Sequence, residues 1–297
     1  MCFNIDDIKC AEFFIQKENE EFYKISIDNS VRDLLQSMLD NTFSEFHNIE
    51  IKQYSPSEKY NSQDKLKLEL NSDYCQNILS IYNNLDIPVD NTQLLENTDK
   101  ISYYFFRLTD SQNRTLLAIK KASLFKAITT QHAHIVRWFN DTLTTFSDNL
   151  FKLDKSFDIV VVNETVFINK YLVFEGIADL GETVRLASTE NIRLIEQRAP
   201  LILFTEEAQN YIKSHIMAAR LVASIKASGY LNNLSLDAVI DACNSQRINI
   251  RVENEQISFD SENTMNFLKL IDRRLFEINL TGEYELYEAP SRQVRNN

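Results

Sequence analysis

Three carboxylates in one short stretch could do chemistry. Asp158, Glu164 and Glu175 lie in "KSFDIVVVNETVFINKYLVFEG", residues 155–176, together with Lys170. Metal-dependent nucleases hold divalent ions with two or three carboxylates, often near a lysine. Two runs of β-branched and aromatic residues flank Asn163-Glu164, however, and this pattern predicts a hairpin with Glu164 at its tip. Asp158 would then lie far down one strand, so we predict structural or solvent-facing roles for these acids. A metal-dependent nuclease is the alternative.

Two histidines form an HxH pair in "QHAHIVRWF", at His132 and His134. On a strand both would lie on one face and could bind a metal, whereas on a helix they point to roughly opposite sides. The surrounding residues favour a helix, so we predict no metal site here. His47 and His215 are isolated, and no Ser, Cys or Thr has a recognisable activating motif near it. We therefore predict no catalytic residue.

Glycine and cysteine usage excludes further classes of site. With only four glycines, the chain can form neither a P-loop nor a dinucleotide-binding loop, and we predict no cofactor. The four cysteines are scattered, which argues against a disulfide framework or a thiolate metal site. No segment approaches the ~18 apolar residues of a membrane span, and the N-terminus lacks the pattern of a signal peptide. We expect a cytoplasmic protein.

The net charge of −12 is unevenly distributed. Residues 1–100 contain 19 acidic and 9 basic residues, which accounts for most of the negative net charge. The whole chain would therefore repel nucleic acid, and any DNA contact must come from a local basic surface on the remainder. Lys213 and Arg220, seven residues apart, would share a helix face. The candidate DNA-binding residues are Lys120, Lys121, Lys126, Arg137, Arg193, Arg198, Lys213, Arg220, Arg273 and Arg274.

The elements that must position these side chains alternate between helix and strand. Apolar residues at helical spacing predict a helix over 30–46, with a capping box at Ser30 and Asp33. Period-two alternation predicts strands near 49–51 and 65–70 in an antiparallel sheet. A helix is expected over 72–85. Then follow a strand, a turn at 110–113, a second strand, and a connecting helix through 138–146.

The second half begins with the hairpin that contains Asp158. After it we predict one long helix over 206–228, a helix over 235–243, and strands around Ile250 and Ile257. A helix over 262–273 and a hairpin around Thr281-Gly282 follow. The predicted class is α+β, with two domains at 1–128 and 129–297. Each would pack helices on a mixed or antiparallel sheet.

Residues 101–290 resemble the KwaB family of the Kiwa anti-phage defence system. The resemblance is carried by "FKLDKSFDIVVVNETVFINKYLVFEGI" (151–177) and "FLKLIDRRLFEINLTGEYELYEA" (267–289). The family pattern of Phe-x-Leu-x-x-x-Phe-Asp, strand, turn, aromatic strand and Phe-Glu matches residues 151–175. The family pattern has a glycine-containing turn where this chain has Asn163-Glu164. Because glutamate disfavours positive φ, we expect a wider loop here.

The resemblance implies a bacterial defence protein that binds DNA without a known nuclease motif. It would block replication or transcription of phage DNA. Its partner would be a KwaA-like membrane protein that senses infection and recruits it to the inner membrane. We also predict a homodimer. The second alternative is a protein-interaction module that binds through the acidic first third and never contacts nucleic acid.

Overall fold

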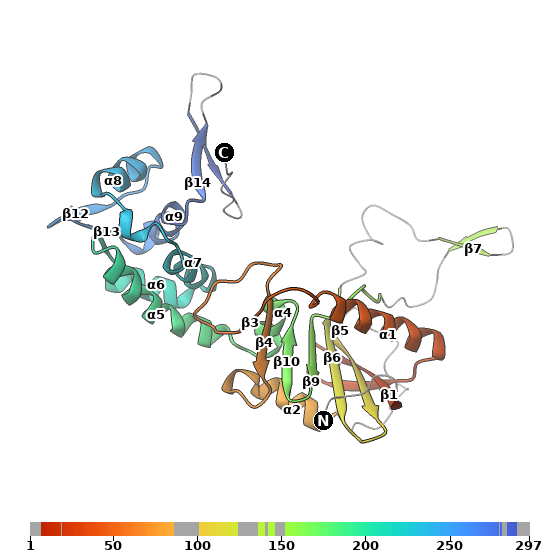
Figure 1. Cartoon of the computed structure of the whole chain (residues 1–297). Helices are drawn as coiled ribbons and strands as arrows, with labels where there is room; N and C mark the ends of the chain where they lie inside the picture. The colour runs from red at the N-terminus through yellow and green to blue at the C-terminus, as the bar shows by residue number, and fades with distance from the viewer. Residues whose placement is uncertain are drawn as a thin grey trace. The chain divides into compact units, whose positions relative to one another are not determined.

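The computed structural model describes residues 7–18, 20–85, 101–123, 136–139, 142–145, 152–278, 280 and 284–289. It confirms the α+β class (Figure 1). The chain forms two compact units. Unit 1 contains residues 1–54 and 61–179, and unit 2 contains residues 55–60 and 180–297.

Unit 1 is built on an eight-stranded sheet in the order β2-β1-β5-β6-β9-β10-β4-β3. The pairings are antiparallel except for β3 and β4, which are parallel. The predicted boundary at 128/129 falls between β6 and β9, which are neighbours in this sheet. The strands are β1 (Ile8–Lys17), β2 (Phe22–Ile25), β3 (Ile51–Gln53), β4 (Lys65–Glu69), β5 (Ile101–Asp110), β6 (Thr115–Lys121), β9 (Ile159–Val162) and β10 (Thr165–Ile168).

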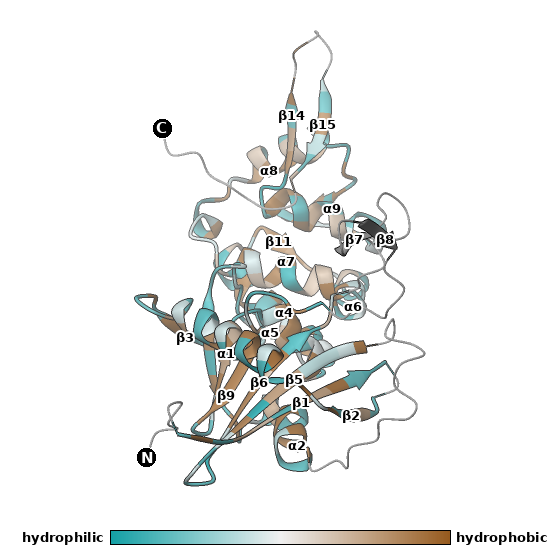
Figure 2. Ribbon diagram, turned by 90° about the vertical axis from the view of Figure 1, so that its right-hand side faces the viewer, coloured by the Kyte–Doolittle hydropathy of each residue, from teal (hydrophilic) through white to brown (hydrophobic). Residues whose placement is uncertain are grey.

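Helices cover both faces of this sheet because its central strands are apolar on both sides. α1 (Asn29–Ser44) packs Leu35 and Leu39 against one face, in a cluster with Phe106 and Val160. The 3-10 turn Asp73–Cys75, α2 (Gln76–Asn84) and α4 (Tyr171–Ile177) are the other helical elements of the unit. Figure 2 shows β6 and β9 as mostly hydrophobic strands. Helix α1 begins after Asp28, whose carboxylate accepts the Val31 N–H, so the predicted capping box at Ser30 is wrong.

The predicted connecting helix through 138–146 is also wrong. Residues Val136–Phe139 form strand β7, which pairs antiparallel with β8 (Thr142–Thr145). β-Branched and aromatic residues dominate both segments, and they favour a strand. His132 and His134 lie outside the described residues.

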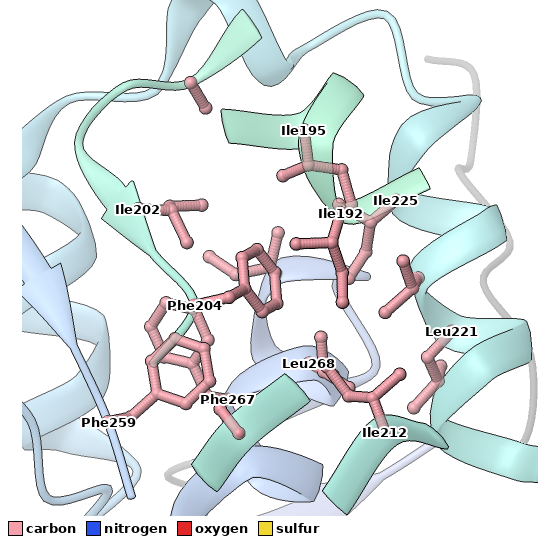
Figure 3. Packing of buried hydrophobic residues seen from close by; sticks show 14 of the residues in the cluster. Ile192, Ile195, Ile202, Phe204, Ile212, Leu221, Ile225, Phe259, Phe267 and Leu268 are labelled. Carbon is pink, nitrogen blue, oxygen red and sulfur yellow. The ribbon is translucent and has the colours of Figure 1, made fainter. Parts of the chain in front are cut away.

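Unit 2 is mostly helical around one apolar cluster (Figure 3). The ring of Phe259 packs between those of Phe204 and Phe267, with centroid distances of 5.5 Å to Phe204 and 4.1 Å to Phe267. The helices are α5 (Gly181–Arg198), α6 (Glu206–Ser214), α7 (Ile216–Lys226), the 3-10 turn Leu231–Asn233, α8 (Leu236–Ser245) and α9 (Ser261–Ile271). The strands are β11 (Ile202–Leu203), β12 (Arg251–Glu253), β13 (Gln256–Ser258), β14 (Leu275–Ile278) and β15 (Glu285–Glu288).

The single helix predicted over 206–228 is two helices. His215 has an extended backbone, with φ −125° and ψ 106°, and it ends α6 and precedes α7. Its ring stacks on Tyr211 at 4.0 Å between centroids. Because the helix ends there, Lys213 and Arg220 lie on different helices, and the prediction that they share one face is wrong.

A short segment between β3 and β4 belongs to unit 2. The Ser57 carbonyl accepts hydrogen bonds from Lys226 Nζ at 3.0 Å and Asn191 Nδ2 at 3.2 Å. Glu58 forms an ion pair with Lys226 at 2.8 Å. These contacts place residues 55–60 with α5 and α7, while the flanking strands are part of unit 1.

Two hairpins turn on the same dipeptide. Asn163 and Glu164 join β9 to β10 with φ values of 52° and 62°, and Asn254 and Glu255 join β12 to β13 with 50° and 63°. Two central residues with positive φ make a type I′ turn, whose twist suits a two-residue hairpin. The wider loop that we expected at Asn163-Glu164 is therefore wrong.

Glu164→Gly is expected to stabilise the protein by about 0.5–1 kcal/mol. A left-handed backbone strains a non-glycine residue by roughly 1–2 kcal/mol, and the greater freedom of glycine in the unfolded chain offsets part of that gain. Urea unfolding measures the change. Glu164→Ala is the control, because it removes the side chain and keeps the strain. Equal stabilities for the two variants would contradict the role of the backbone.

Candidate nucleic-acid interface

Asp158 joins three strands at one end of the unit 1 sheet. The register that pairs Ile119 with Ile159 brings the end of β6 beside the residue before β9. Asp158 is only 3% exposed, and its carboxylate accepts hydrogen bonds from Lys120 Nζ at 2.8 Å and Lys121 N at 3.0 Å. The Asp158 carbonyl accepts the N–H groups of Asn169 and Lys170, which follow β10. The acid singled out from sequence is thus a structural anchor.

Five lysines lie on the three chain segments that meet at this anchor. Together with the two acids of these segments we call them the lysine cluster: Lys120, Lys121, Lys152, Lys155, Lys170, Asp154 and Asp158. Lys120 Nζ also lies 4.0 Å from Asp154, which pairs with Lys152 at 3.0 Å. Lys121, Lys155 and Lys170 are exposed. With five positive and two negative side chains, the cluster carries a local charge of +3.

A neutral polar group lies next to the cluster. Lys65, buried on β4, pairs with Glu45 at 2.9 Å and donates to the Asn169 side chain. Asn169 in turn donates to the Phe157 carbonyl at 2.9 Å. Burial raises the pKa of Glu45, but hydrogen bonds from Lys65 and Ser156 outweigh it, so the pKa lies below its usual value. This pair therefore leaves the charge of the cluster unchanged.

The three exposed lysines have the chemistry of a phosphate-binding surface. Lysine is a compact point charge on a flexible stem and contacts phosphate oxygens without reading base sequence. Asp158 holds the backbone at Lys121 and Lys170, while Asn41 Nδ2 donates to the carbonyl of Lys155 at 3.2 Å. The backbone that carries these side chains is thereby fixed, although the chain as a whole is acidic.

The candidate basic residues of unit 1 have different surroundings. Lys121 is exposed within the cluster, whereas Lys120 is half-buried against Asp158. Arg137 lies on β7, and its side chain, like the whole of Lys126, is outside the described residues.

Most candidate basic residues of unit 2 contact other groups of that unit. Arg193 is exposed and pairs with Glu190 one helical turn away. Arg198 donates to the carbonyls of Lys226 at 2.5 Å and Ser228 at 2.7 Å, and so closes the C-terminal end of α7.

The remaining candidates lie on or after three other helices of unit 2. Arg274 pairs with the fully buried Asp272 at 2.7 Å, and the exposed Arg273 lies over the Tyr230 ring at 3.9 Å. Lys213 and Arg220 are half-buried on α6 and α7. DNA contact by these residues stays a prediction.

Three members of the cluster, namely Lys152, Lys155 and Lys170, were not among the predicted DNA-binding residues, and Lys170 was considered only as part of the nuclease alternative. Two of them lie in the stretch that drew attention for its acids. The sequence does show Lys152 and Lys155 just before Asp158, and Lys170 just after the second predicted strand. That Lys170 returns to the side of Asp158 follows only from the register of β9 and β10. Counting basic residues along the chain does not supply that register.

The three acids of the nuclease alternative lie apart. Asp158 and Glu164 are at opposite ends of β9, and Glu164 is exposed in the turn. Glu175 is buried on α4, where it accepts a hydrogen bond from the Tyr54 hydroxyl at 3.1 Å. Within the described ranges, no three His, Cys, Asp or Glu side chains are grouped as they would be to hold a metal ion.

Comparison with known proteins identifies the family. The family model described as "Kiwa protein KwaB-like" matches residues 98–281, which is more than half of the chain. The chain therefore belongs to the KwaB-like family, and this membership implies a role in Kiwa anti-phage defence. Neither the curated proteins nor the solved structures gave a significant match. The matched range includes all members of the lysine cluster, while β1 to β4 precede it.

In the part of the chain that the structure describes, no helix is long and apolar enough to cross a membrane.

Proposed function

We propose that this protein is the cytoplasmic, DNA-binding effector of a Kiwa-type defence system. It would bind duplex DNA without sequence preference through the lysine cluster and so block replication or transcription of phage DNA. The observation that carries the proposal is the local charge of +3 at a fixed sheet end in a chain of net charge −12. The family membership supports the defence role.

The proposal also includes partners. The protein would act as a homodimer, together with a KwaA-like membrane protein that senses infection and brings it to the inner membrane. Family membership supports more than one protein in the system. The separation of Asp158, Glu164 and Glu175 favours binding over metal-dependent cleavage.

Gel shifts with plasmid DNA across a salt series, with Mg²⁺ or with a chelator, test the proposal. We expect a shift that weakens steeply as salt rises and no cleavage, because non-specific binding releases counterions from phosphates. Chelator-sensitive cleavage would instead support the nuclease alternative. No shift at the lowest salt would support a protein-interaction module and overturn the proposal.

A further inference from the structure

The hairpin β14–β15 presents an apolar surface. Phe276 and Tyr287 are cross-strand partners whose rings stack at 5.7 Å, yet both side chains are more than two-fifths exposed. Leu280 near the tip is 89% exposed and Tyr284 is 67% exposed. Large apolar side chains gathered in this way mark interaction sites more often than solvent-facing surface.

The base of the hairpin is fixed to unit 2. Leu275 packs against the apolar cluster, Lys269 pairs with Glu288 at 2.8 Å, and Ser245 donates to Glu277 at 2.7 Å. The backbone N–H of Ala289 also donates to the Arg274 carbonyl at 2.8 Å. The exposed apolar side chains therefore belong to an anchored element.

The hairpin also has backbone edges that can accept another strand. Among the described residues, β14 and β15 pair only with each other. The outer edge of each strand thus presents backbone N–H and C=O groups, which can pair with an added strand. A two-stranded hairpin is only marginally stable alone, and a third strand would reinforce it.

The negative charge of the hairpin indicates what kind of strand could bind at its edge. Residues 275–288 contain four glutamates and no lysine, arginine or histidine. Along β14, Phe276 and Ile278 lie on one face and Glu277 on the other. A strand added at this edge would match it if apolar residues alternated with basic ones, since side chains on adjacent strands interact in pairs. DNA, an anionic membrane and a second copy of the same acidic hairpin would all be repelled.

We propose that the β14 edge docks an extended segment of a protein partner in which apolar and basic residues alternate. This docking surface is separate from the lysine cluster and does not depend on DNA binding. The partner strand would pair with the β14 backbone, place its apolar side chains beside Phe276 and Ile278, and place a basic side chain beside Glu277.

Fluorescence anisotropy with labelled twelve-residue peptides tests the proposal on the full chain. The probes are an alternating Lys/Val peptide, an alternating Glu/Val peptide, and a peptide with the lysines and valines in two blocks. We expect the alternating basic peptide to bind at least tenfold tighter than either of the others. Equal binding of the alternating and block peptides would overturn the proposal, because it would indicate charge attraction alone.

Substitutions on β14 test whether the peptide binds at this edge. Glu277→Lys is expected to remove most of the preference for the basic peptide over the acidic one, because it places like charge beside the added strand while the other three glutamates remain. Phe276→Ser with Ile278→Ser is expected to weaken binding of the basic peptide at least tenfold. Leu34→Ser with Leu186→Ser is the matched control, because these side chains are similarly exposed on α1 and α5. Circular dichroism checks the fold of each variant, and Leu280→Ser at the tip provides a variant that leaves the paired strands untouched.

Other occupants give distinct results. The proposal fails if the edge variants bind the peptide as the wild type does. It also fails if sedimentation shows a dimer for the wild type and a monomer for the edge variants. The proposal also fails if the wild-type protein binds anionic vesicles or duplex DNA and the edge variants lose that binding. Gel shifts of the same variants keep the two proposals apart, because DNA binding through the lysine cluster should be unaffected.

Discussion

Asp158→Ala is expected to lower the free energy of unfolding by about 3–5 kcal/mol. The substitution removes one partner of a buried ion pair and leaves Lys120, whose side chain is 14% exposed, without its closest carboxylate. It also leaves the Lys121 N–H without its side-chain acceptor. A loss of this size is a large share of the ~5–15 kcal/mol that stabilises a typical domain.

Urea denaturation monitored by circular dichroism measures this loss. Asp154→Ala is the control, since Asp154 is more exposed and lies 4.0 Å from Lys120. It should cost less than about 1 kcal/mol, as surface pairs do. Asp158→Leu combined with Lys120→Met should recover much of the loss, because it removes both charges together. A cost below 1 kcal/mol for Asp158→Ala would contradict the anchoring role.

Replacing Lys121, Lys155 and Lys170 with alanine should weaken DNA binding roughly 100-fold. Each lysine–phosphate contact contributes on the order of 1 kcal/mol in high dielectric, and about 1.4 kcal/mol is a tenfold change in affinity. All three side chains are exposed, so the fold should be retained. Fluorescence anisotropy with a labelled duplex at fixed salt gives the affinity.

A triple variant at Lys9, Lys52 and Lys67 controls for net charge. These lysines are also exposed and lie in unit 1 outside the cluster. Their replacement by alanine changes the total charge by the same amount, so any difference in DNA affinity between the two triple variants comes from the position of the lysines. Equal loss of affinity in the two variants would mean that overall charge, and no particular surface, governs binding.

The hairpins and amphipathic helices of this fold could be predicted from local patterns. Helix α1 has a clear apolar stripe, and the β9–β10 hairpin has two β-rich runs around a turn dipeptide. Helix α5 went unpredicted because two of the residues on its buried side, Ser188 and Asn191, are polar and obscure the period. The predicted long helix failed at His215, which no glycine or proline marks.

The candidate site depended on contacts that a linear sequence does not contain. Asp158 meets Lys120 across 38 residues, and it does so only because β6 and β9 are paired in one register. Sequence reasoning predicted a structural or solvent-facing role for Asp158 and named Lys120 and Lys121 as DNA-binding candidates, but it treated these lysines as separate surface charges. The sheet brings them together as one positively charged group.

The dependence of DNA affinity on salt shows directly whether Lys121, Lys155 and Lys170 contact phosphates. For wild type and the Lys121/Lys155/Lys170 triple alanine variant, the logarithm of the association constant is plotted against the logarithm of salt concentration. We expect the magnitude of this slope to be smaller by about 3 in the triple variant, because each lost lysine–phosphate contact lowers it by about 1. An unchanged slope, or wild-type affinity that does not vary with salt, would contradict this expectation.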